Sequence, residues 1–125
     1  MPISEIKPKN DIQYRLTKVL RSRMRIVLKH NMAKKSDHTL ALCGCDIKTL
    51  IVHIESKFLS GMTWDNYGKY GWHIDHIKPC AAFDLTKPEE QRSCFNYKNL
   101  QPLWGVDNHK KNSFYDGEYI RKGAK

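Results

Sequence analysis

Three short segments hold the residues with the clearest chemical potential. They are His73-Ile74-Asp75-His76-Ile77-Lys78-Pro79, then Asn99-Leu100-Gln101-Pro102-Leu103-Trp104, and finally Asp107-Asn108-His109-Lys110-Lys111. A carboxylate and an amide oxygen suit a hard divalent cation, and a histidine suits proton abstraction from water. Together, these residue types could build a single-metal site that hydrolyses a phosphodiester bond.

The elements that must position these residues can be predicted from the same segments. Residues 71–77 alternate as a short strand, with Trp72 and Ile74 on one face and His73 and Asp75 on the other. A second strand covers about residues 100–104, where Pro102 confines it to an edge. Between the strands, Pro88 suits the first turn of a small helix, and the two glutamates after it suit that helix's N-terminus.

A last helix is expected to start near Val106 or Asp107, after Gly105. Asn108 and Lys111 are three residues apart on it and therefore share a face. Strand, loop, strand and helix make up a ββα unit, so we predict the α+β class, with further helices on the N-terminal side.

These residues resemble the HNH endonucleases of the ββα-metal superfamily, and specifically the small HNH proteins common in bacteriophage genomes. The resemblance runs from about Leu42 to Lys111. An isolated Asp-His pair is a weak signal, whereas Asp-His-Ile-x-Pro with a downstream Asn-Leu-Gln-Pro-Leu and an Asn-x-x-Lys is a strong one. The alternative for Asp75 and His76, an ordinary strand-end salt bridge, is disfavoured by the full motif.

The resemblance implies a role for each matching residue. Asp75 is similar to the carboxylate metal ligand, and His76 to the general base that activates the attacking water. Asn99 matches the middle asparagine, which helps fix the hairpin loop and the orientation of the histidine. Asn108 matches the final position, which is a second histidine ligand in much of the family. The motif is therefore H-N-N, and an Asp/Asn oxygen pair favours Mg²⁺ or Mn²⁺.

Three further residues are candidates for supporting roles. Neighbouring helical residues point about 100° apart, so only one of Asn108 and His109 should face the metal, and the spacing to Lys111 favours Asn108. His73 shares the strand face of Asp75 and could bind metal, water or phosphate, or be structural. Lys111 could contact a phosphate or be an ordinary surface lysine.

The implied reaction is hydrolysis of a DNA phosphodiester with one metal ion, leaving 5′-phosphate and 3′-hydroxyl ends. Two alternatives stay open: a catalytically silent DNA-binding module, and an RNase or structure-specific nuclease on the same scaffold. The sequence leaves open the cleavage specificity, the number of strands cut and the biological role. The sequence also leaves open whether the protein forms a homodimer or associates with other phage DNA-processing proteins.

The positive charge is concentrated near the N-terminus. Residues 1–35 carry ten lysines and arginines against two acids, whereas residues 36–125 carry twelve against eleven. A helix is predicted from Asp11 to about Lys34, with an apolar stripe for the core: Ile12, Leu16, Val19, Leu20, Met24 and Val27. Its opposite side carries a basic stripe: Arg15, Lys18, Arg21, Arg25 and Lys29. A solvated face is the ordinary explanation, but five bases without an acid favour a nucleic acid as the partner, and the resemblance implies that it is double-stranded DNA.

A second helix is predicted from its N-cap Asp46, with Gly61 as the stop signal. His53 within it is expected to be a surface or hydrogen-bonded histidine rather than a ligand. The aromatic and glycine residues at 62–71 could stack on bases, but core packing is their commoner use. We therefore expect a basic helical DNA-binding segment at 1–41, a nuclease core at 42–113 and a polar, less ordered tail at 114–125.

The four cysteines bear on location and on metal binding. No signal peptide or membrane span is evident, so an intracellular protein with free, mostly buried thiols is expected. A zinc knuckle is disfavoured, because Cys43-Gly44-Cys45 has the wrong gap and Cys80 and Cys94 stand apart in the sequence.

Overall fold

The computed structural model of the chain describes residues 7–68, 70–111, 114–115 and 118–119, with side chains for 12–68, 70–108 and 111. Helices and a small antiparallel sheet make up these residues, which confirms the predicted α+β class. In chain order the elements are α1 (Lys7–His30), α2 (Thr39–Cys43), α3 (Ile47–Ser56), β1 (Trp72–His76), α4 (Pro88–Phe95), β2 (Leu100–Trp104), α5 (Gly105–Lys111), β3 (Phe114–Tyr115) and β4 (Glu118–Tyr119).

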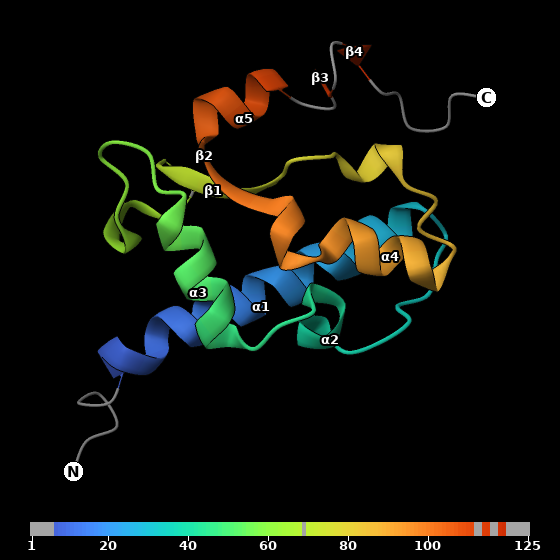
Figure 1. Cartoon of the computed structure of the whole chain (residues 1–125), viewed down its shortest axis with the longest axis horizontal. Coiled ribbons are helices and arrows are strands. Elements are labelled where there is room, and N and C mark those ends of the chain that lie inside the picture. The colour runs from blue at the N-terminus through green and yellow to red at the C-terminus, as the bar shows by residue number, and fades with distance from the viewer. Residues whose placement is uncertain (1–6, 69, 112–113, 116–117, 120–125) are drawn as a thin grey trace.

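The two predicted strands pair as an antiparallel hairpin at the centre of the molecule. Asp75 lies opposite Gln101, and Ile74 lies opposite Pro102. In Figure 1 the hairpin lies between α5 on one side and α1 on the other, with α3 and α4 flanking it. The apolar side chains of β1 are fully buried and belong to the same core as α1, so the two faces of the strand have different surroundings.

Helix α1 supplies one side of that core. Leu16, Leu20 and Met24 are buried as predicted, and Leu28 extends the stripe by one more turn. The predicted end near Lys34 is wrong, because the helix stops at His30. Met32 takes a left-handed φ of 54°, and the Ala33 N–H donates to the Leu28 carbonyl, which closes the helix as a Schellman-type turn does.

Helix α3 begins as predicted, because the Asp46 carboxylate accepts a hydrogen bond from the Thr49 N–H at 2.8 Å. It ends at Ser56, so the predicted continuation towards Gly61 is wrong. The preceding α2 was not predicted, since its five residues are too short to display a helical period. The predicted small helix at Pro88 is confirmed as α4.

The aromatic and glycine segment packs against the core. Trp72 is fully buried and stacks on Tyr67, with their ring centroids 4.5 Å apart. Trp64 meets Trp72 edge-on at 5.2 Å, and its indole N–H donates to Glu55. The packing interpretation is therefore confirmed for these rings, whereas Tyr70 is 94% exposed.

The tail expected to be less ordered contains a short antiparallel pair, β3 with β4, and its other residues lie outside the described part of the chain. No helix within the described residues has the length and apolar character needed to cross a membrane.

Candidate active site

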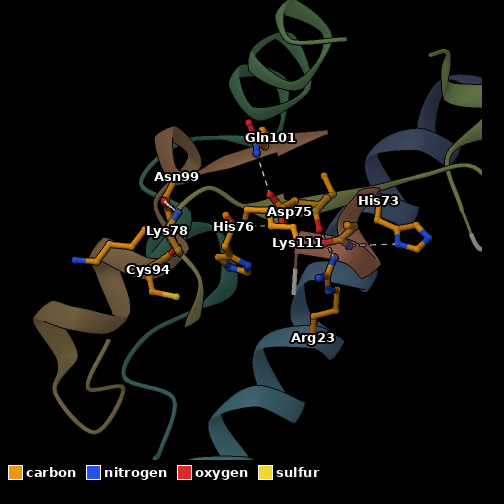
Figure 2. A network of polar contacts seen from close by, with 11 residues as sticks. Arg23, His73, Asp75, His76, Lys78, Cys94, Asn99, Gln101 and Lys111 are labelled. Atoms are coloured by element: carbon orange, nitrogen blue, oxygen red, sulfur yellow. Dashed lines mark hydrogen bonds and ion pairs between the residues drawn. The ribbon is translucent and has the colours of Figure 1, made fainter. Parts of the chain in front are cut away.

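Asp75 is a buried carboxylate on the face of β1 that meets α5. Only 5% of the residue is exposed. The Gln101 side chain opposite it donates to Oδ2 at 2.9 Å, and the Lys111 ammonium lies 3.4 Å from Oδ1 (Figure 2). The short bond fixes one oxygen firmly, and the longer ion pair holds the other loosely.

Helix α5 directs two polar side chains at β1. Lys111 Nζ donates to the His76 carbonyl at 2.8 Å, in addition to its contact with Asp75. Asn108 Nδ2 lies 3.5 Å from Nδ1 of His73. The prediction that Asn108 and Lys111 share a face is therefore confirmed, and so is the shared face of His73 and Asp75. The side chain of His109 lies outside the described residues.

His76 is the last residue of β1, and its ring belongs to the opposite layer from Asp75. It lines a pocket of about 450 Å³ that α1 covers with Leu20, Arg23 and Met24. The ring is half-buried and meets Phe95 edge-on at 5.9 Å. His76 is therefore accessible from the pocket, while its backbone carbonyl is bound by Lys111.

Asn99 ties together the two chain segments around His76. Its Oδ1 accepts from the Lys78 N–H at 2.9 Å, while Nδ2 donates to the carbonyls of Lys78 at 3.0 Å and Cys94 at 2.9 Å (Figure 2). The Asn99 carbonyl also accepts from the Ile77 N–H. The loop after β1 and the end of α4 thus converge on this one amide.

Two cysteines that are distant in the sequence lie beside His76. Cys94 donates from its thiol to the sulfur of Cys80 at 3.5 Å. Ligand atoms of His76, Cys80 and Cys94 all lie within 4.8 Å of one another, so this cluster could hold a metal ion. The hydrogen bond from Cys94 lowers the pKa of Cys80, and His76 lowers it further. The prediction that Cys80 and Cys94 are too far apart to share a metal site is therefore wrong, because the loop after Cys80 and α4 bring the two sulfurs together.

The basic residues of α1 divide into two groups. Lys18, Arg21, Arg25 and Lys29 are exposed on the side away from the core, as predicted. Arg15 differs, since it is half-buried, donates to the Tyr67 carbonyl at 3.1 Å and lies over the Tyr67 ring. Arg23 was not assigned to the basic stripe, but it donates to the Ile74 carbonyl at 2.7 Å beside the pocket (Figure 2).

Four residues around the site are not predicted from the sequence: Arg23, Cys80, Cys94 and Gln101. Gln101 could have been found by pairing the two predicted strands, because it lies directly opposite Asp75. The other three come from α1, the turn Cys80–Ala82 and α4, whose approach to β1 no local pattern indicates.

Comparison with known proteins gives two viral relatives. The chain is 40% identical over 127 residues to the uncharacterized protein L426 of Acanthamoeba polyphaga mimivirus. This alignment covers 98% of this chain and 54% of that protein. It is 36% identical over 99 residues to the uncharacterized protein L246 of the same virus, covering 79% of this chain and 42% of that protein. The chain thus spans about half the length of the curated relatives it matches. No protein-family model matches it, and neither does any solved structure to a significant degree.

Proposed function

We propose that the chain is a divalent-metal-dependent DNA endonuclease of the HNH type, built on its β1–β2–α5 unit. The observation that carries this proposal is the buried Asp75 carboxylate, which faces a helix that also presents Asn108 and Lys111 to the same strand. A carboxylate buried this fully needs hydrogen-bonding or charged partners, and Gln101 and Lys111 supply them on the face of β1 that also meets Asn108.

The donor set fits a hard cation such as Mg²⁺ or Mn²⁺. Among the residues that the structure describes, Asp75 Oδ1 has only the long contact to Lys111, whose ammonium keeps its shorter bond to the His76 carbonyl. Asn108 turns its amide nitrogen towards His73, so the amide oxygen is the atom it could offer to a cation. Asp75 and Asn108 would hold the ion, and water and phosphate oxygens would complete its shell. When bound, the ion would stabilise negative charge on the phosphate and on the leaving oxygen.

His76 would act as the general base. It adjoins Asp75 in the chain and ends β1, but its ring lies on the other face of the strand, in the pocket under α1. The water that it activates would therefore approach the phosphate from the side opposite the metal, at the end of β1. Asn99 holds the backbone on the C-terminal side of His76, and Lys111 holds its carbonyl. Both contacts restrict the backbone that carries the imidazole. A catalytic group held in position in this way accelerates the reaction, because less freedom is lost in reaching the transition state.

The substrate proposed is double-stranded DNA, recognised mainly through its phosphates. The chain has a formal net charge of +9, and Lys18, Arg21, Arg25 and Lys29 form an exposed basic side of α1. Arg23 is the α1 arginine next to the pocket that His76 lines, and is a candidate for a further contact to the DNA backbone. Binding dominated by phosphate contacts should weaken steeply with salt and show little sequence preference.

The test is a supercoiled-plasmid assay with Mg²⁺, Mn²⁺ or EDTA. Asp75→Asn and His76→Ala are compared with His38→Ala, a control at an exposed histidine before α2. We expect metal-dependent nicking or linearisation that falls by about 100-fold or more in His76→Ala, the range typical of a lost general base, and is retained in His38→Ala. Circular dichroism of each variant establishes that it is folded.

Retardation of the plasmid without cutting in any metal would contradict the nuclease proposal and favour a DNA-binding module. Competition by RNA or by branched DNA in the same assay separates a duplex DNA nuclease from a nuclease with another substrate.

A further inference from the structure

The cluster of His76, Cys80 and Cys94 draws its members from three different elements. His76 ends β1, Cys80 starts the turn Cys80–Ala82 and Cys94 lies in the last turn of α4. Cys94 is fully buried, whereas His76 and Cys80 are half-buried. Their candidate ligand atoms lie within 4.8 Å of one another, and the two sulfurs are 3.5 Å apart.

These separations suit a small thiophilic cation. A tetrahedral Zn²⁺ bound at about 2.3 Å by sulfur and about 2.0 Å by nitrogen has ligand atoms spaced by roughly 3.5–3.8 Å. The sulfur pair already lies at the lower end of this range, and the widest separation in the cluster needs only a small side-chain adjustment. Two cysteines and an imidazole are a poor donor set for Mg²⁺, which prefers oxygen ligands.

The backbone holds the ligands together without a metal. Asn99 bonds the carbonyl of Cys94 on one side and both backbone groups of Lys78 on the other. The segment that carries Cys80 is thereby fastened to the helix that carries Cys94. A preorganised set of ligands binds an ion more tightly, because less freedom is lost on binding.

The pocket gives access to the cluster. His76 and Cys80 line it together with Arg23 and His30 of α1, while Cys94 lies behind them in the core. An ion held by the three side chains would therefore have one side towards the pocket, where water or another ligand could take the fourth position. Three protein ligands with an open position distinguish this arrangement from a closed structural zinc site.

We propose that His76, Cys80 and Cys94 form a binding site for one thiophilic divalent cation of the Zn²⁺ type, open to the pocket on one side. This site is distinct from the Asp75 and Asn108 pair and takes a different class of metal. A consequence rests on the proposed nuclease function: an ion on His76 occupies the nitrogen needed to accept a proton, so Zn²⁺ inhibits cleavage supported by Mg²⁺.

The binding test uses Co²⁺ as a spectroscopic probe of the full chain, reduced with a non-chelating phosphine. We expect one equivalent of Co²⁺ to produce visible bands of a tetrahedral ion and a near-ultraviolet thiolate-to-cobalt charge-transfer band, both removed by Zn²⁺. Loss of a residue that only hydrogen-bonds to a ligand weakens metal binding by roughly 10- to 100-fold. Cys80→Ser and Cys94→Ala each remove a direct ligand and should weaken Co²⁺ binding by more than this. His76→Ala should keep the sulfur band but weaken the affinity.

Cys45→Ser is the matched control, since Cys45 is another half-buried cysteine and lies outside the cluster. Binding should be unchanged in it. A Co²⁺ spectrum without the thiolate band, no saturation at one equivalent, or a band lost in Cys45→Ser would overturn the proposal. X-ray absorption on the Zn²⁺-loaded wild type, which should show two sulfur ligands, decides the question even if a cysteine variant fails to fold.

The cleavage assay then separates the two proposals. If Co²⁺ binds as expected but the wild type cuts no plasmid under any condition, the metal site stands and the nuclease proposal fails. If the protein cuts but Co²⁺ does not bind through sulfur, the reverse holds. If both hold, added Zn²⁺ should reduce Mg²⁺-supported cleavage by wild type and by Cys45→Ser. It should reduce cleavage by Cys80→Ser to a smaller extent.

Discussion

Replacing Asn99 should destabilise the protein far more than replacing a similar asparagine three residues earlier. The Asn99 side chain makes three hydrogen bonds, to the N–H and carbonyl of Lys78 and to the carbonyl of Cys94. Each such bond contributes about 1 kcal/mol net, so Asn99→Ala should lower the free energy of unfolding by about 3 kcal/mol. That is roughly a 100-fold change in the folding equilibrium constant.

Urea unfolding followed by tryptophan fluorescence measures this loss, because Trp72 is fully buried. With an m-value of about 2 kcal/mol/M, the midpoint should fall by about 1.5 M. Asn96→Ala is the control: Asn96 is also half-buried, and its side chain accepts one hydrogen bond, from the Lys98 N–H at 2.9 Å. Its loss should cost about 1 kcal/mol or less.

A third variant tests the directions of these bonds. Asn99→Asp keeps the acceptor for the Lys78 N–H but sets an anionic oxygen against two carbonyl oxygens. It should be at least as destabilised at pH 7 as Asn99→Ala. Equal losses in Asn99→Ala and Asn96→Ala, or a fully stable Asn99→Asp, would refute the account of Asn99 as the tie between the loop and α4.

Three further predictions concern other elements. Lys111→Met removes the ammonium beside Asp75 and the bond to the His76 carbonyl. It should lower the free energy of unfolding in urea by about 1–3 kcal/mol. An unchanged midpoint would show that the ion pair is not formed in solution. Gly71→Ala should cost about 2 kcal/mol or more in the same assay, because a Cβ there would lie 1.6 Å from the Asn66 carbonyl oxygen, and near-wild-type stability would contradict this close approach. Asp46→Asn tests the cap of α3: the Thr49 N–H lowers the pKa of Asp46, so the carboxylate's contribution is complete above its unfolded pKa of about 3.9 and is lost as the pH falls through the lower folded pKa. The variant should therefore be less stable than wild type at pH 7 and nearly equal to it in strong acid, and a difference that persists in acid would count against the linkage.

Local residue patterns are enough to predict several elements of this fold. Residues close to one another in the sequence predict the Asp46 cap of α3, the alternating strand β1, the edge strand β2 and the start of α4 at a proline. The shared face of His73 and Asp75, and that of Asn108 and Lys111, follow from strand and helix periods. The order of these elements then predicts a hairpin followed by a helix, and with it the α+β class.

The elements that the two faces of β1 contact are set by tertiary packing, and no local residue pattern predicts them. Adjacent residues on a strand point in opposite directions, so Asp75 faces α5 while His76 reaches the pocket under α1. Cys80 and Cys94 are separated by fourteen residues but lie 3.5 Å apart, because a loop and α4 fold back beside β1. Arg15 donates to the carbonyl of Tyr67, fifty-two residues away in the sequence, and is therefore not exposed with the other bases of the stripe. Such contacts depend on how the elements pack against one another, and the sequence periods that define each element carry no information about its packing partner.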